Sequence, residues 1–117
     1  MKTTVRSAFE KICSLIHGKC VLYVGVADYS KDCAILDKDN WLISIDKQIS
    51  EMKFGARKHY VMDLTKLDFP DNYFDVVFML GVVGYGLDKP EDIFKAFEQV
   101  KRVLKPDGSV IFTVTKK

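Results

Sequence analysis

The sequence is poor in cysteine and has no long apolar run. Its three cysteines are Cys13, Cys20 and Cys33. An odd number without C-x-x-C spacing disfavours a disulfide framework and indicates a reducing compartment, so we expect a cytoplasmic protein. The longest uncharged stretch, Val76 to Leu87, is shorter than the ~18 residues of a membrane-spanning helix. Charged residues throughout the first 20 positions leave no apolar stretch for a signal peptide.

An excess of charge of one sign is also lacking. The 18 Lys and Arg residues are balanced by 16 Asp and Glu, and the net charge is +2. A charge this small gives no basis for binding nucleic acid or a membrane. No Ser-His-Asp, Cys-His or paired-carboxylate arrangement stands out. Cys13, His17 and Cys20 fit no standard zinc spacing, so we predict no metal site.

The chain has the length and composition of one folded domain. It has 117 residues, 48% of them apolar, without an internal repeat or a linker-like segment. We expect a single domain over residues 1–117, with an N-terminal helix in 1–18 and a core in 19–117. The apolar spacing from Val5 predicts that this helix is amphipathic and ends near His17-Gly18.

Five short runs of apolar and β-branched residues follow the first helix. They are continuous rather than alternating, which is typical of strands buried on both faces of a parallel sheet. The sequence therefore predicts an α/β fold with flanking helices. The predicted strands are Cys20 to Val24, Trp41 to Ile45, His59 to Met62, Val76 to Leu80 and Val110 to Val114.

Two connections have recognisable helix signals. An apolar stripe predicts a helix from Pro90 to Leu104, and Asp88 with Glu91 has the spacing of a capping box. After it, Lys105-Pro106-Asp107-Gly108 predicts a turn in which the glycine permits a positive φ. The segment from Ser30 to Asn40 has few apolar residues, and we expect only a short helical turn with solvated flanks there.

Two longer segments resemble the class I methyltransferases that use S-adenosylmethionine, in particular their small-molecule, type 11-like branch. The stretch from Asp63 to Val77, D-L-T-K-L-D-F-P-D-N-Y-F-D-V-V, parallels the family pattern D-A-x-x-L-P-F-P-D-x-S-F-D-x-V. Val103 to Gly108 parallels V-L-K-P-G-G. The resemblance implies a Rossmann-like, doubly wound parallel sheet of five strands in the order 3-2-1-4-5.

In such a sheet, ligands bind at the carboxyl ends of the strands where the strand order reverses. The resemblance implies that an acid after strand two, here Asp46, holds both ribose hydroxyls, and that Asp63 faces the adenine amino group. Turn formation is the alternative role of either aspartate. The full set of residues expected around the donor is Gly25, Ala27, Asp46, Lys47, Asp63, Leu64, Leu80, Gly81 and Val82.

The first loop departs from the family pattern. Methyltransferases have an acid two residues before a G-x-G-x-G loop, whereas this chain has Tyr23 at the acid position and only Gly25 of the three glycines. Ala27 and Tyr29 replace the other two, and glycines at such positions let the backbone approach the cofactor. We therefore expect donor binding to be weakened or rearranged. The glycine-rich stretch from Gly81 to Gly86 lacks dinucleotide-fingerprint spacing and predicts a pliable loop.

The predicted last strand would form an apolar edge. Family members continue into an antiparallel hairpin, whereas this sequence ends at Lys117. Long exposed edges tend to be paired or covered, so we expect a homodimer or a partner protein along residues 110–114, in particular Val110, Phe112 and Val114.

Three functions remain open at this point. The first is a methyltransferase with S-adenosylmethionine as its cofactor, whose acceptor the sequence does not identify. The second is a non-catalytic relative that serves as a binding or regulatory subunit, and the third is a nucleotide-binding domain of another α/β type. No catalytic residue is assigned, because methyl transfer needs no protein nucleophile. Tyr29, Tyr85 and Asp88 are the polar residues expected near an acceptor.

Overall fold

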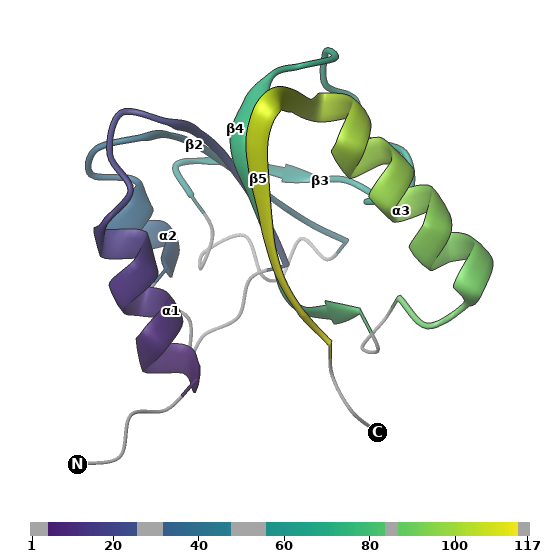
Figure 1. The fold of residues 1–117 in the computed structure, drawn as a ribbon, viewed down its shortest axis with the longest axis horizontal. Helices are drawn as coiled ribbons and strands as arrows, with labels where there is room; N and C mark the ends of the chain where they lie inside the picture. The colour runs from purple at the N-terminus through teal and green to yellow at the C-terminus, as the bar shows by residue number, and fades with distance from the viewer. Residues whose placement is uncertain (1–4, 26–31, 48–55, 84–86, 115–117) are drawn as a thin grey trace.

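The computed structural model describes residues 5–25, 32–47, 56–83 and 87–114. A five-stranded, all-parallel sheet in the order β3-β2-β1-β4-β5 lies between α1 and α2 on one face and α3 on the other (Figure 1). The predicted α/β fold and strand order are confirmed. The elements are α1 (Val5–Ser14), β1 (Cys20–Val24), α2 (Asp32–Leu36), β2 (Trp41–Asp46), β3 (Lys58–Val61), β4 (Phe74–Val83), α3 (Pro90–Val103) and β5 (Leu104–Val114).

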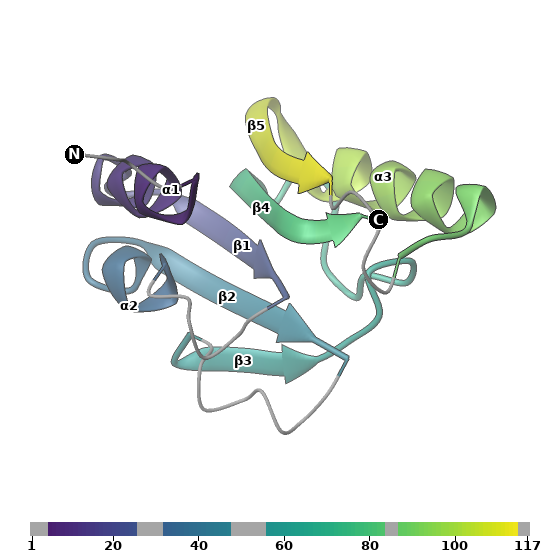
Figure 2. The same cartoon turned by 90° about the horizontal axis from the view of Figure 1, so that it is seen from below.

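The central strands are buried on both faces. Along β1, Val21 and Tyr23 pack into the core under α1 and α2, while Leu22 and Val24 pack into the core under α3. Figure 2 shows the sheet between these two helical layers. This arrangement explains why the strand sequences are continuously apolar, since neither face is left to solvent. No helix in the described part of the chain is long and apolar enough to cross a membrane.

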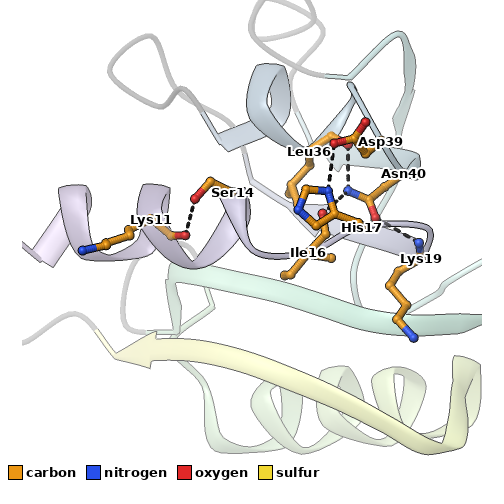
Figure 3. A network of polar contacts seen from close by, with 8 residues as sticks. All are labelled: Lys11, Ser14, Ile16, His17, Lys19, Leu36, Asp39 and Asn40. Carbon is orange, nitrogen blue, oxygen red and sulfur yellow. Dashed lines mark hydrogen bonds and ion pairs between the residues drawn. The ribbon is translucent and has the colours of Figure 1, made fainter.

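One asparagine joins the first two helices to the sheet (Figure 3). The Asn40 side-chain amide donates hydrogen bonds to the carbonyl oxygens of Ile16 (2.9 Å) and Leu36 (3.0 Å). Its side-chain oxygen accepts a bond from the Lys19 backbone N–H (2.9 Å). Asn40 thus ties the residues that follow α1 to the end of α2 at the amino-terminal edge of the sheet.

The start of α3 differs from the prediction. The N-cap residue is Lys89, Pro90 stands at the first helical position, and no side chain caps the helix. Proline favours that position because its fixed φ suits the helix and it has no N–H to satisfy. The helix therefore begins one residue later than a capping box with Asp88 as its N-cap would require, and Asp88 and Glu91 do not form the expected box.

The turn expected after α3 is part of β5. Between the pairs Phe74↔Leu104 and Val76↔Ser109, one residue of β4 opposes four of β5, so the stretch forms a bulged strand. Gly108 is not among the residues with positive φ. A Cβ there would lie 2.8 Å from Leu104 Cδ2 and 3.0 Å from the Lys105 carbonyl oxygen. Close packing, rather than the expected positive φ, therefore requires this glycine.

The segment before β2 forms the expected short helix. It is the five-residue α2, but the expectation of solvated flanks is wrong for its first residue. Asp32 is 0% exposed. The apolar residues Cys33 and Leu36 pack toward the sheet and draw the start of the helix into the core with them.

Candidate functional site

The carboxyl ends of β1, β2 and β3 are joined side by side. The Gly25 N–H, just past β1, donates to the carbonyl oxygen of Ile45 in β2 (2.9 Å). The Met62 N–H, just past β3, donates to the carbonyl oxygen of Asp46 (3.0 Å). Gly25, Asp46 and the residues that follow Met62 therefore lie along one edge of the sheet, as the sequence predicted from strand topology.

Gly25 is the glycine that this edge requires. Its φ is +77°, a conformation that residues with a Cβ seldom adopt. A Cβ built on Gly25 would lie 3.2 Å from Val82 Cγ2. The end of β1 therefore lies against β4, and two residues of the predicted donor site are in close proximity.

Asp46 is the last residue of β2, where an acid was expected. Its side chain is half-buried, and the following residue, Lys47, is exposed. Lys47 is close enough to Asp63 that its positive charge contributes to lowering the pKa of that carboxyl group. These three charged residues thus occupy adjacent positions at the ends of β2 and β3.

Asp63 forms a turn. Its Oδ1 accepts hydrogen bonds from the Thr65 backbone N–H (2.9 Å) and the Thr65 hydroxyl (2.8 Å). These two bonds are the main reason why the pKa of Asp63 is lowered, with Lys47 and Lys66 contributing less. Asp63 is therefore ionised at neutral pH. The alternative role of a turn residue applies, and it engages one of the two carboxylate oxygens.

The β4 residues of the predicted site belong to the strand itself. The sequence analysis predicted that this strand ends at Leu80 and that a loop follows from Gly81, but β4 continues to Val83 with an irregular pairing to β5 between Met79 and Val83. Leu80 is buried in the core under α1 and α2, and Leu64 is buried in the core under α3. We therefore expect their backbone atoms, not their side chains, to face a ligand, together with the backbone of Gly81.

Some predicted residues lie outside the described part of the chain. These residues are Ala27, Tyr29 and Tyr85. Asp88 is described and is exposed just before α3. The three cysteines are free thiols. Within residues 5–25, 32–47, 56–83 and 87–114, no cluster of three or more His, Cys, Asp or Glu side chains is arranged to hold a metal ion.

A buried polar pair that was not evident from the sequence lies next to this edge. The Tyr23 hydroxyl donates a 2.5 Å hydrogen bond to Asp32 Oδ2, and the two residues are 1% and 0% exposed. Burial, followed by the neighbouring charge of Asp32, helps to raise the pKa of the Cys33 thiol to about 12. The only signal in the sequence was a tyrosine at a position where the related family has an acid.

A cavity lies elsewhere on the molecule. It has a volume of about 630 Å³ and is lined by α3 and the turn before β4, through Asp71, Asn72, Phe94, Phe97, Glu98, Lys101 and Arg102. Asp71 and Asn72 precede β4, so this cavity is not part of the carboxyl edge. The predicted donor residues do not line it.

Comparison with known proteins identifies the fold independently. Residues 22–112 match the family model described as methyltransferase domain. No curated protein sequence matches the chain. The PH0226 protein from Pyrococcus horikoshii OT3 is 21% identical over 94% of this chain and 55% of its own, with a TM-score of 0.73.

Two further structures have the same fold. The S-adenosylmethionine dependent methyltransferase from Mesorhizobium loti is 17% identical over 95% of this chain and 54% of its own, with a TM-score of 0.74. The [4+2]-cyclase SpnF is 21% identical over 94% of this chain and 43% of its own, with a TM-score of 0.73. The chain thus spans about half the length of these structures. Together with the family match, the description of the Mesorhizobium loti protein supports S-adenosylmethionine as the cofactor of the fold.

Proposed function

Because the chain belongs to the methyltransferase-domain family, we propose that it binds S-adenosylmethionine at the carboxyl edge of its sheet and acts in methyl transfer. The observation that carries this proposal is the adjacency of Gly25, Asp46 and Val82 at that edge. At this edge, the backbone of Gly25, which has no Cβ, lies near the half-buried carboxylate of Asp46 and the apolar side chain of Val82. These groups suit a nucleoside, whose sugar needs hydrogen-bond acceptors and whose base needs apolar contact.

Each residue has a proposed role. Asp46 accepts hydrogen bonds from both ribose hydroxyls, which a carboxylate with two oxygens can do. Asp63 accepts from the adenine amino group through Oδ2, because Oδ1 is engaged by Thr65. Gly25 allows the backbone to approach the donor, and Val82 packs beneath it. Lys47, Leu64, Leu80, Gly81 and Ala27 complete the proposed contacts.

The chemistry itself requires little from the protein. The donor supplies a methyl group already activated on a sulfonium sulfur, and its transfer to a nucleophilic acceptor gives S-adenosylhomocysteine and a proton. The protein contributes by binding and orienting the two molecules, and orientation can account for most of the acceleration.

A thermal-shift titration tests donor binding. Either S-adenosylmethionine or S-adenosylhomocysteine at 100 times its dissociation constant is expected to stabilise the protein by about 2.7 kcal/mol. Asp46→Ala should abolish this stabilisation because it removes the acceptor for the ribose hydroxyls. The melting temperature with and without each compound is the measurement.

Asp107→Ala provides the matched control. It removes an exposed carboxylate from β5, outside the carboxyl edge, and should keep the full ligand-induced shift. If neither compound shifts the melting temperature at millimolar concentration, the donor-binding proposal is wrong. A shift that survives Asp46→Ala would retain binding but reject the role given to this residue.

A second function is favoured by a residue of β1 that departs from the family pattern. Tyr23 is buried at the position where the related family has an acid, and its hydroxyl bonds to Asp32 rather than lying in the crevice. The same fold also occurs in a protein described as a [4+2]-cyclase, so the fold by itself does not imply methyl transfer. The alternative is a non-catalytic binding or regulatory subunit. It predicts ligand-induced stabilisation without S-adenosylhomocysteine production when candidate acceptors are supplied, whereas a methyltransferase produces it.

We also propose that two copies of the chain associate through β5 and α3. Of the residues predicted to form the apolar edge, Val110 packs against the core, and the side chain of Val114 lies outside the described residues. Phe112, however, is 47% exposed and Phe94 is 66% exposed. The Phe112 ring lies edge-on to Phe97, with ring centroids 5.3 Å apart. Phe94, Phe97 and Phe112 together form an aromatic surface next to β5. This surface and the unpaired outer side of β5 in the described part of the chain favour pairing with a second copy.

Light scattering tests the dimer. Wild-type protein at micromolar concentration should have twice the monomer mass, and the double variant Phe94→Glu/Phe112→Glu should have the monomer mass. Leu15→Glu is the control, because it places the same charge at an exposed apolar residue of the chain, outside α3 and β5. A monomeric wild type, or a dimer that survives the double substitution, contradicts the proposal.

The remaining proposals concern domain organisation and compartment. We propose that residues 1–117 form one domain, since α1 packs on the same sheet as the other helices. We propose a cytoplasmic location on the basis of the three free thiols, which suit a reducing environment.

A further inference from the structure

Tyr23 and Asp32 connect three elements near the carboxyl edge. The Tyr23 ring stacks on Phe78 of β4, with ring centroids 5.7 Å apart and an interplanar angle of 26°. Its hydroxyl reaches Asp32, the first residue of α2, at 2.5 Å. Because both residues are buried, their hydrogen bond is made in a low-dielectric interior, where it is stronger than at the surface. One side chain thus links β1, β4 and α2.

This link lies close to the proposed donor residues. Tyr23 is two residues before Gly25, whose position beside Val82 depends on where β1 ends. Phe78 is two residues before Leu80 in the neighbouring strand, and it pairs directly with Tyr23. Only residues 26–31 separate Gly25 from Asp32, so the bond fixes the distance that this connection must span.

We propose that the Tyr23–Asp32 hydrogen bond is a positioning device that holds Gly25 and the end of β1 in the conformation that binds the donor. The inference rests on the proposed function. Both side chains are buried, 1% and 0% exposed, so we assign them a positioning role rather than contact with the ligand.

Binding of S-adenosylhomocysteine, measured by calorimetry, tests the proposal. Tyr23→Phe removes the hydroxyl and leaves Asp32 buried without this donor, which should raise the dissociation constant about tenfold or more. Asp32→Ala should have a similar effect, and the double variant should be no weaker than the weaker single variant, because both remove the same bond. Asp32→Asn keeps an acceptor oxygen and should restore most of the affinity.

Labelling of Cys33 by a thiol reagent provides a readout without ligand. Cys33 is buried beside Asp32, and the pKa of its thiol is raised to about 12, so wild-type labelling should be slow. Tyr23→Phe should accelerate it about tenfold by loosening α2. In the binding experiment, Val100→Ala controls for a general loss of stability. It creates a cavity under α3 and should leave the dissociation constant for S-adenosylhomocysteine within about twofold of the wild-type value.

The outcomes separate the two proposals. If wild-type protein does not bind S-adenosylhomocysteine, the proposed function is wrong and this inference loses its basis with it. If wild type binds and Tyr23→Phe binds equally well, the positioning role is wrong while donor binding stands. A loss of affinity in Val100→Ala equal to that in Tyr23→Phe would also overturn the inference, since it would reflect stability alone.

Discussion

Arg102→Ala is expected to lower the free energy of unfolding by about 3 kcal/mol. The guanidinium of Arg102, near the end of α3, donates to four acceptors in a partly buried site. These are the carbonyl oxygens of Leu67 (2.8 Å) and Phe69 (2.7 Å), Asp71 Oδ1 (2.8 Å) and Gln99 Oε1 (3.0 Å). Alanine leaves the two carbonyl oxygens and Asp71 Oδ1 without this donor, whereas Gln99 Oε1 still accepts from the Leu67 backbone N–H (3.2 Å). Urea denaturation followed by circular dichroism measures the loss.

Two further substitutions, one at the neighbouring residue and one at Arg102 itself, control for this loss of stability. Lys101→Ala removes an exposed cation from the same helix and should change the free energy of unfolding by less than about 0.5 kcal/mol. Arg102→Lys keeps the charge but cannot reproduce the planar fork, so it should lose about half as much as alanine. A loss below about 1 kcal/mol in Arg102→Ala would show that the four bonds are not stabilising.

The contacts of Arg102 also matter for the candidate site. The segment it holds follows Asp63 and leads into β4, and the backbone N–H groups of Asn72 and Tyr73 donate to the carbonyl oxygens of Arg102 (3.0 Å) and Val103 (2.7 Å). The end of α3 therefore anchors the whole connection between two strands of the proposed donor site.

The sheet could be predicted because its signal is local. Strands buried on both faces must be continuously apolar, and residues such as Val21 to Val24 have this texture whatever their partners are. The motif from Asp63 to Val77 then supplied the strand order through resemblance to a family. The carboxyl edge follows from that order, so the adjacency of Gly25, Asp46 and Val82 was predictable.

The features that could not be predicted depend on tertiary partners. Asp32 reads as a solvated residue next to Lys31, yet it is buried because the Tyr23 hydroxyl meets it across the core. Gly108 reads as a turn residue, yet it is needed because the Lys105 carbonyl oxygen packs against it. Neither partner is evident from local sequence. For the same reason, the donor roles of Asp46 and Asp63 remain predictions, because their ligand is not part of the chain.

Asn40→Ala is expected to lower the free energy of unfolding by about 2 to 3 kcal/mol. Alanine removes all three side-chain hydrogen bonds that tie Ile16 and Leu36 to Lys19 (Figure 3). The two carbonyl groups and one N–H group at the amino-terminal edge then lose their partner. For a domain of this size the melting temperature should fall by roughly 10 °C, which calorimetry can measure.

Two variants separate the hydrogen-bond network from simple loss of a polar group. Asn40→Asp keeps the acceptor for the Lys19 N–H but places carboxylate oxygens against the carbonyl oxygens of Ile16 and Leu36. It should therefore destabilise at least as much as alanine. Asp39→Ala removes only an exposed ion pair with His17 and should cost less than about 1 kcal/mol. If Asp39→Ala destabilises as much as Asn40→Ala, the surface pair, and not the partly buried amide of Asn40, joins α1 and α2 to the sheet.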